Sequence, residues 1–211
     1  MAVPLDGIRA IHNAFRKDMT AMDQAAYAAA GGHGSLDLVS KRYTFFNQVL
    51  AWHAKGEEED VFPIMENVAP LVAEAYERDH RGLDKAFEAL DRAIKASAPL
   101  QVCRATSAFD FHLSIHLSKE EAHLYRIFND KVSLPDQGVA IGKITQKIPQ
   151  ERFPEVIDWL YPLMAPDDRE NMTRLWKQGL PGPVFAQATK RVRQVIGSGW
   201  EDLVRRIPDL T

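Results

Sequence analysis

The chain has 211 residues, of which 45% are hydrophobic, so it is long and apolar enough to bury a core. Lys and Arg (26) nearly balance Asp and Glu (29), which gives no sign of a nucleic-acid or anionic-membrane partner. The single cysteine, Cys103, excludes an internal disulfide and a thiolate-based metal site. Asp6 and Arg9 interrupt the N-terminus before any signal-like stretch. We therefore expect a soluble, cytoplasmic protein without a membrane span.

The first half of the chain contains two segments with the apolar spacing of amphipathic helices. Over 6–30, inward positions recur every three or four residues, at Leu5, Ile8, His12, Phe15, Met19, Met22 and Ala26. Over 35–60 they are Leu36, Val39, Tyr43, Phe46, Leu50, His53 and Glu57. We expect the second helix to end near Asp60, because Pro63 disfavours helical geometry at the residue before it.

Two further segments have the same spacing. The third helix, over 70–96, has its inward positions at Val72, Tyr76, His80, Leu83, Phe87, Leu90 and Ile94. The fourth, over 99–132, has them at Val102, Ala105, Phe109, His112, His116, Glu120, His123 and Ile127. Four such helices joined by short loops predict an all-α fold, an antiparallel up-down-up-down four-helix bundle.

The chain changes character after the fourth helix. Seven prolines from Pro135 to Pro183 divide it into short amphipathic helices, expected over 139–147, 151–164, 167–178 and 184–207, with a break at Gly197 or Gly199. We predict a bundle domain over 1–131 and, over 132–211, a C-terminal extension of short helices that packs against the bundle.

Histidine occupies an inward position on each of the four long helices, at His12, His53, His80 and His116. A buried imidazole without a partner costs about 1–3 kcal/mol, so four of them need a common partner. Glu57 and Glu120 follow His53 and His116 by four residues, which places each carboxylate on the same helix face as its histidine.

The histidine pattern is also repeated. Residues 53–64 align without a gap on 116–127, and His12 and His80 precede the two segments at corresponding places. Two copies of this unit supply four imidazoles and two carboxylates. This donor set suits a pair of first-row metal ions bridged by the carboxylates.

The pattern of His, then His-x3-Glu, repeated twice, resembles the hemerythrin-like (HHE) cation-binding family over about residues 5–131. The resemblance implies that His12, His53, His80 and His116 are terminal ligands of a non-haem di-iron site. It likewise implies that Glu57 and Glu120 are the bridging carboxylates of that site. The segment after Leu134 resembles, more weakly, the one that follows hemerythrin repeats in plant iron-sensing ubiquitin ligases.

Two positions differ from the oxygen-carrying hemerythrins. Tyr76 stands where those proteins have a further histidine, and His116 and Glu120 form His-x3-Glu where those proteins have His-x4-Asp. Reversible oxygen carriage of that type is therefore not expected.

Four other residues are candidates for a ligand or pocket role, namely His112, Tyr76, Glu58 and Glu121. His112 is interpreted as a fifth ligand, as a hydrogen-bond donor to a bound molecule, or as a bundle residue bonded to Tyr76 or a backbone carbonyl. Glu58 and Glu121 are alternatives to the chosen carboxylates, or partners that hydrogen-bond a ligand imidazole. His33 and His123 are expected on the surface.

Two imidazoles and two shared carboxylates leave each iron open positions, for an oxo or hydroxo bridge and for a small ligand. The aromatic side chains of Phe15, Phe46, Phe87 and Phe109 should keep this pocket dry. The sequence thus predicts binding or sensing of iron, dioxygen, peroxide or nitric oxide. The alternatives are a peroxide-decomposing or oxidase enzyme assisted by His112 or Tyr76, or a bundle that holds a mononuclear metal or a haem.

Overall fold

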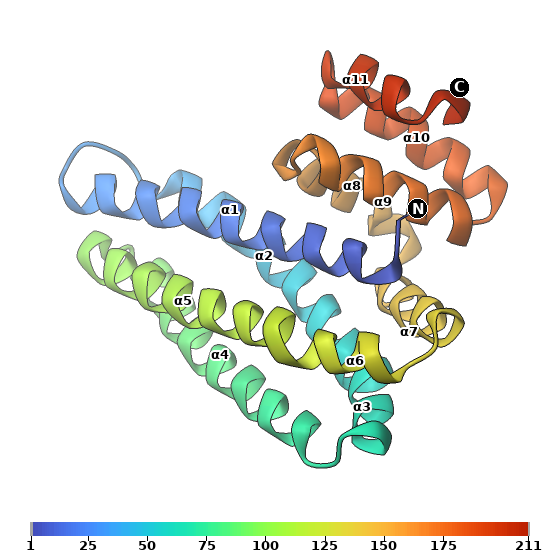
Figure 1. Cartoon of the computed structure of the whole chain (residues 1–211). Coiled ribbons are helices and arrows are strands. Elements are labelled where there is room, and N and C mark those ends of the chain that lie inside the picture. The colour runs from blue at the N-terminus through green and yellow to red at the C-terminus, as the bar shows by residue number, and fades with distance from the viewer. Residues whose placement is uncertain (1, 211) are drawn as a thin grey trace.

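The computed structural model describes residues 2–210, and the regular elements within them are all helical, which confirms the predicted all-α class. Four long segments lie side by side (Figure 1). They are α1 (Pro4–Ala30), α2 (Asp37–Gly56), α4 (Val72–Lys95) and α5 (Pro99–Lys119). The α1–α2 and α4–α5 loops lie at the same end, an arrangement compatible with the expected up-down-up-down bundle.

The core of the bundle is formed by the inward positions of these four helices. Phe15 of α1 and Phe46 of α2 are fully buried and meet edge to face, with ring centroids 5.5 Å apart. Leu90 and Phe109 complete this core from α4 and α5. Each such side chain contributes about 1.5–3 kcal/mol through its burial. This apolar packing holds the four helices in register around the polar residues described below.

The second and fourth long helices each contain a π-helical turn, and through it the second helix continues beyond its expected stop. Segment η1 (Glu57–Val61) joins α2 to α3 (Phe62–Val68), and η2 (Glu120–Leu124) joins α5 to α6 (Tyr125–Lys131). The predicted end near Asp60 is therefore wrong. Pro63 lies in the first turn of α3, where a residue without an N–H group is tolerated. The turn at η2 has the same position in its repeat but no proline after it, so proline is not its cause.

The C-terminal segment forms a succession of short helices. They are α7 (Leu134–Gln146), the 3-10 turn η3 (Gln150–Arg152), α8 (Phe153–Leu163), α9 (Pro166–Gly179), α10 (Gly182–Ile196) and α11 (Gly199–Arg206). Prolines stand in the first turns of α7 to α10, and α7 begins at Leu134 rather than at the expected residue 139. The expected break of the last helix occurs at Gly197, whose φ is 53°.

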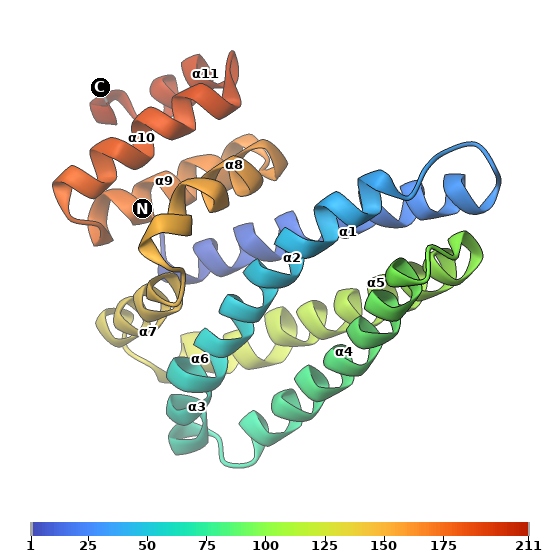
Figure 2. The same cartoon turned by 180° about the vertical axis from the view of Figure 1, so that it is seen from behind.

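Of these short helices, α7, α8 and α9 pack against α1 or α2, and α10 and α11 lie on α8 and α9 (Figure 2). Ala10 and Ala14 of α1 are buried among side chains of α8 and α9. Asp18 of α1 is fully buried, accepts a hydrogen bond from Trp159 Nε1 at 2.7 Å and pairs with Arg42. The division into domains at residue 131 stays a prediction. Within residues 2–210, no helix is both long and apolar enough to cross a bilayer.

Candidate metal centre

Four imidazoles from four helices converge in the interior of the bundle. His12 comes from α1, His53 from α2, His80 from α4 and His116 from α5, and none is more than 6% exposed. Glu57 and Glu120, the first residues of the two π-helical turns, are fully buried beside them. The six residues predicted from the repeated pattern thus share one buried space.

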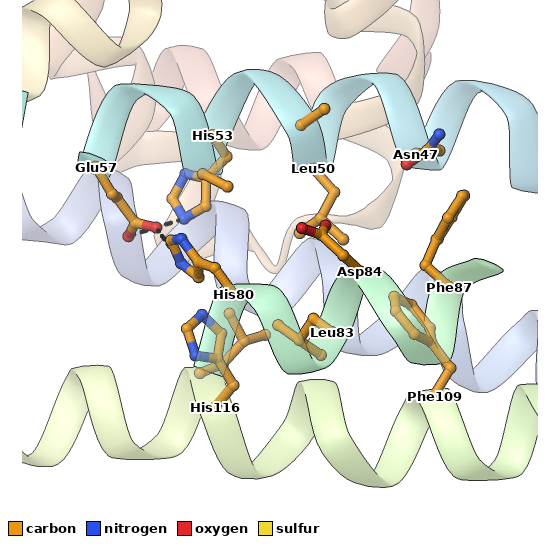
Figure 3. Close-up of a pocket in the computed structure, with 13 residues that line it drawn as sticks. Asn47, Leu50, His53, Glu57, His80, Leu83, Asp84, Phe87, Phe109 and His116 are labelled. Atoms are coloured by element: carbon orange, nitrogen blue, oxygen red, sulfur yellow. Dashed lines mark ion pairs between the residues drawn. The ribbon is translucent and has the colours of Figure 1, made fainter. Parts of the chain in front are cut away.

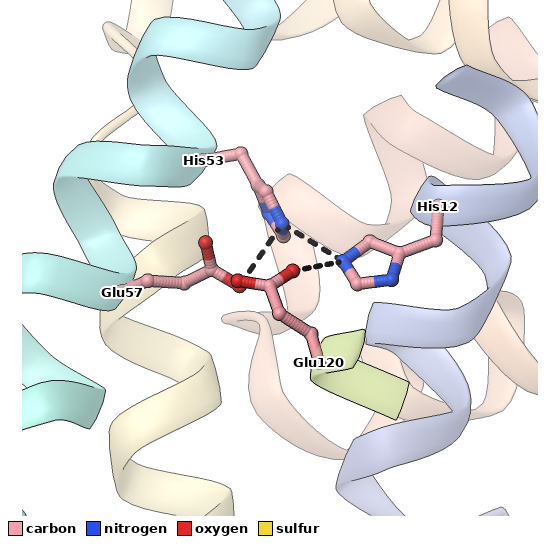
Figure 4. Close-up of side chains that lie close together, drawn as sticks. All are labelled: His12, His53, Glu57 and Glu120. Atoms are coloured by element: carbon pink, nitrogen blue, oxygen red, sulfur yellow. Dashed lines mark hydrogen bonds and ion pairs between the residues drawn. The ribbon is translucent and has the colours of Figure 1, made fainter. Parts of the chain in front are cut away.

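The first cluster consists of His12, His53, Glu57 and Glu120 (Figure 4). Each offers a nitrogen or oxygen atom, and these atoms lie within 4.8 Å of one another. The Nε2 atoms of His12 and His53 are 3.1 Å apart. His53 Nε2 is 3.2 Å from Glu57 Oε1, and His12 Nε2 is 3.6 Å from Glu120 Oε2. Four nitrogen and oxygen donor atoms this close together suit a metal ion.

The second cluster consists of Glu57, His80, His116 and Glu120. His116 Nε2 lies 3.1 Å from Glu120 Oε1, and His80 Nε2 lies 3.5 Å from Glu57 Oε2. Figure 3 shows His53, His80 and His116 directed toward the same space as Glu57. Both carboxylates belong to both clusters, so the centre has the arrangement of two cation sites joined by two shared carboxylates.

Several polar atoms in these clusters have no hydrogen-bond partner within the described chain. They include both carboxylate oxygens of Glu120, Oε2 of Glu57 and Nε2 of His80. A buried carboxylate without a partner is costly, and buried charges in proteins are paired or coordinate metals. Bound cations would satisfy these atoms, so the donor set fits metal ions on physical grounds.

Two further carboxylates, outside the clusters, orient two of the imidazoles. Glu121 Oε1 accepts a hydrogen bond from His12 Nδ1 at 3.0 Å, and Arg16 also donates to Glu121. Glu58 Oε1 accepts from His80 Nδ1 at 2.7 Å. Each of these carboxylates follows a bridging candidate in sequence but contacts the histidine of the other repeat. Such bonds fix the tautomer and raise the basicity of a ligand imidazole.

The other two imidazoles differ in this respect. His116 Nδ1 lies 3.9 Å from Asp79 Oδ2, beyond hydrogen-bond distance. His53 Nδ1 is buried and has no hydrogen-bond partner within residues 2–210. Each half of the centre therefore has one imidazole with a carboxylate partner and one without.

Tyr125 makes the two halves of the centre unequal. Its hydroxyl donates a hydrogen bond to Glu57 Oε1 at 2.5 Å, and its side chain is only 4% exposed. Phe62 occupies the matching place in the first repeat, so Glu120 has no equivalent donor. The sequence pattern did not single out Tyr125, although the Phe62–Tyr125 pair in the aligned repeats is the signal that could have found it.

The electrostatics of the centre favour cations. Burial alone would raise the pKa of Glu57, but His53 and His80 outweigh it and hold this pKa well below its usual range. The pKa of Glu120 is also lowered, because His116 and His80 outweigh burial and the charge of Glu57. Burial lowers the pKa of His80, but the nearby carboxylates of Glu120, Glu57 and Glu58 outweigh burial and raise this pKa to about 11. Without a metal, protons on imidazole balance the two carboxylates, and a bound cation would replace them.

A small cavity of about 60 Å³ adjoins the clusters. Its wall includes His53, Glu57, His80 and His116 at one end and the apolar side chains Leu83, Phe87 and Phe109 further along (Figure 3). Phe15 and Phe46, also predicted to keep the pocket dry, are buried in the adjacent core rather than in this wall. The cavity has room for a water molecule or a small diatomic ligand.

Four candidate residues lie outside the two clusters. His112 is exposed and contacts Phe111, so the predictions of a fifth ligand and of a pocket donor are wrong. The buried face of α5 includes Leu113, and consecutive helical residues lie about 100° apart. Tyr76 is buried and donates to the Lys119 carbonyl at 2.9 Å. Glu58 and Glu121 take the imidazole-bonding role described above, while His33 and His123 are exposed as expected.

Three curated proteins of Arabidopsis thaliana are similar to this chain. "Zinc finger protein BRUTUS" is 25% identical over 83% of this chain, and "Zinc finger protein BRUTUS-like At1g18910" is 24% identical over 87%. "Zinc finger protein BRUTUS-like At1g74770" is 21% identical over 87%. The chain spans only 15–17% of the length of these relatives.

No solved structure matches the chain significantly. The family description "Hemerythrin HHE cation binding domain" matches residues 3–127, which are more than half of the chain and include all six residues of the two clusters. The alignments with the three relatives cover more of the chain than this and therefore extend into the C-terminal helices. By this match and by its buried His/Glu clusters, the chain belongs to the hemerythrin HHE cation-binding domain family.

Proposed function

We propose that the protein binds two iron ions, one in each cluster, and that it binds or senses a small molecule at this di-iron centre. His12 and His53 are the terminal ligands of one iron, and His80 and His116 those of the other. Glu57 and Glu120 bridge the two. The observation that carries this proposal is that both carboxylates belong to both clusters and that Glu120 has no hydrogen-bond partner at either oxygen.

The donor chemistry supports iron as the metal. The two clusters offer only imidazole nitrogens and carboxylate oxygens, a set that first-row ions such as iron accept. Two imidazoles and two shared carboxylates give each ion four protein ligands, fewer than the six that octahedral geometry requires. When bound, the metal pair would supply open coordination positions for an exogenous ligand.

The small cavity supports dioxygen, peroxide or nitric oxide as that ligand. Its volume of about 60 Å³ excludes bulky substrates, and Leu83, Phe87 and Phe109 give it an apolar wall. Neither of the residues considered for proton transfer supports an enzyme, because His112 is exposed and the Tyr76 hydroxyl is bonded to a backbone carbonyl. Binding or sensing is therefore preferred to catalysis.

The contact between α7 and the end of α2 gives the centre a route to the C-terminal helices. A Cβ added at Gly56 would lie 2.9 Å from Ile144 of α7, so these two helices are in close contact one residue before Glu57. Lys147 pairs with Glu59 and Asp60 of η1 at 2.7 Å each. A change in the position of Glu57 on metal binding would therefore also displace α7.

Two measurements test this function. Iron-loaded protein should contain two irons per chain and show the near-ultraviolet charge-transfer absorption of a bridged iron pair, whereas a haem would give an intense Soret band. Limited proteolysis should cut metal-free protein faster than loaded protein near residues 132–150. Identical digestion of the two forms would contradict the sensing role, and an absence of bound iron would contradict the centre itself.

A further inference from the structure

A large cavity of about 740 Å³ lies between the bundle and the C-terminal helices. Residues of α1 and α2 form one wall, and residues of α7, α8 and α9 form the other. Ligand pockets in proteins commonly measure about 300–1,000 Å³. The cavity is therefore of a size that accepts a small organic molecule, many times larger than the space beside the metal clusters.

This cavity is separate from the small one described above. The small cavity lies among α2, α4 and α5, whereas the large one lies on the opposite side of α2, against α1 and the C-terminal helices. Among residues 2–210, His53 alone lines both. The metal centre and the large cavity thus share one imidazole. The large cavity has far more room than a diatomic ligand would fill.

Apart from His53, the inner wall of the large cavity is apolar. Ile8, Val49, Met172 and Trp176 are buried at its wall, and no Lys, Arg, Asp or Glu is among the described residues that line it. A charged ligand group placed there would lose its hydration without gaining a partner. The occupant that this wall suits is neutral and consists mostly of hydrocarbon.

Three glutamine side chains of the lining lie toward solvent. Gln146, Gln150 and Gln178 are exposed members of its lining, and each amide can both donate and accept a hydrogen bond. An apolar body inside and one neutral polar group at this rim would satisfy both parts of the cavity.

The packing of α7 keeps this space open. Ile144 lies against Gly56 of α2, and Lys147 pairs with Glu59 and Asp60, which fixes α7 at one place on the bundle. Further along α7, a Cβ added at Gly142 would meet no atom within 4 Å. The C-terminal part of α7 is thus fixed on the bundle. At Gly142 the absence of a side chain leaves space that belongs to the cavity.

We propose that this cavity binds a neutral, hydrocarbon-rich small molecule with one terminal hydroxyl or carbonyl group, of which a medium-chain alcohol is the simplest representative. The hydrocarbon lies between α1, α2 and α9, and the polar group lies at the glutamine rim. The C-terminal helices then form half of a second binding site. This site does not depend on the metals, although its occupant would lie against His53.

The test is a calorimetric titration of the full chain with 1-dodecanol below its solubility limit, in metal-loaded and metal-free protein. Dodecanoate and dodecyltrimethylammonium serve as charged probes of equal chain length. Saturable binding of one dodecanol per chain in both forms, at least tenfold tighter than binding of either charged probe, is expected. No saturable binding of dodecanol, or equal binding of a charged probe, would overturn the proposal.

Matched variants locate the site. Gly142→Trp should weaken dodecanol binding at least tenfold by filling the cavity, whereas Gly142→Ala should leave it unchanged. Gly82→Trp, on α4 and outside both cavities, controls for an added indole.

Val139→Asp is a second variant, to be used if Gly142→Trp does not fold. It places a charge on an exposed part of the lining and should also weaken binding. Unchanged binding in a folded Gly142→Trp or Val139→Asp protein would contradict the assigned location. Metal content equal to that of the unmodified chain separates this outcome from failure of the di-iron proposal.

Discussion

Tyr125 donates a hydrogen bond to Glu57 at 2.5 Å, in a bundle whose other bridging candidate, Glu120, has no such donor. The two carboxylates are therefore unequal, although the sequence around them is repeated. Glu57 has a fixed orientation before any cation binds, and Glu120 depends on the imidazoles and on the cations. This relationship distinguishes the two halves of the centre more clearly than the cluster distances do.

Replacing Tyr125 with Phe should lower the free energy of unfolding of metal-free protein by about 1.5–3 kcal/mol, because a buried charged acceptor loses its donor. Urea unfolding monitored by circular dichroism measures this change. Tyr76→Phe is the matched control, since its hydroxyl donates to the uncharged carbonyl of Lys119, and it should cost only about 0.5–1.5 kcal/mol. Equal stability of Tyr125→Phe and the unmodified chain would show that the bond to Glu57 contributes nothing.

The outer carboxylates should govern metal affinity. Glu121→Gln and Glu58→Gln each weaken the acceptor that orients an imidazole, and loss of such a partner costs about 10–100-fold in metal affinity. Competition with a chelator of known affinity measures the change. His112→Gln, at an exposed position near the same centre in sequence, should leave affinity unchanged. An affinity loss in His112→Gln as large as in Glu121→Gln would argue against the assignment of the outer partners.

The contact of α7 with α2 should be sensitive to one methyl group. Gly56→Ala brings a Cβ to 2.9 Å from Ile144, so the two helices must separate, at a cost of about 1–3 kcal/mol. Gly142→Ala makes the same change on α7 where no atom lies within 4 Å, and it should stabilise the protein by about 0.5–1 kcal/mol. Thermal unfolding of both variants checks the opposite signs. Equal shifts of the two would mean that α7 is not held where the structure places it.

The six cluster residues could be predicted from sequence because each lies at an inward position of a strongly periodic helix. Burial of His12 and His53 follows directly from a stripe of apolar neighbours, and the repeat of His-x3-Glu then places the carboxylates. The pairing of Glu58 with His80 required the structure, because Glu58 lies off the inward stripe of its helix and its partner is on another helix.

Two errors of the sequence interpretation have local physical causes. His112 was placed on the inward stripe of the fourth helix, but the buried face includes its neighbour Leu113, and one residue turns a helix by about 100°. Pro63 is expected to end the second helix. In the structure it lies in the first turn of α3, which follows directly on the π-helical turn η1. Periodicity does not reveal a π-helical turn within a helix.

The starts of α8, α9 and α10 were accessible from sequence because prolines stand at their first turns, whereas α7 begins five residues before its expected start at 139. Their placement against α1 and α2 was expected in outline only. The cavity between them depends on how Ile144 meets Gly56 and how α9 crosses α1, and such tertiary contacts have no signature in local sequence.

Metal content per chain tests the central claim most directly. Elemental analysis of protein loaded with iron and freed of excess should give two irons per chain. Glu120→Ala should lose both, because Glu120 belongs to both clusters, and His53→Ala should lose the iron of the His12 cluster first. Circular dichroism of each variant checks that it remains folded. Full metal content in both folded variants would contradict the proposed di-iron centre.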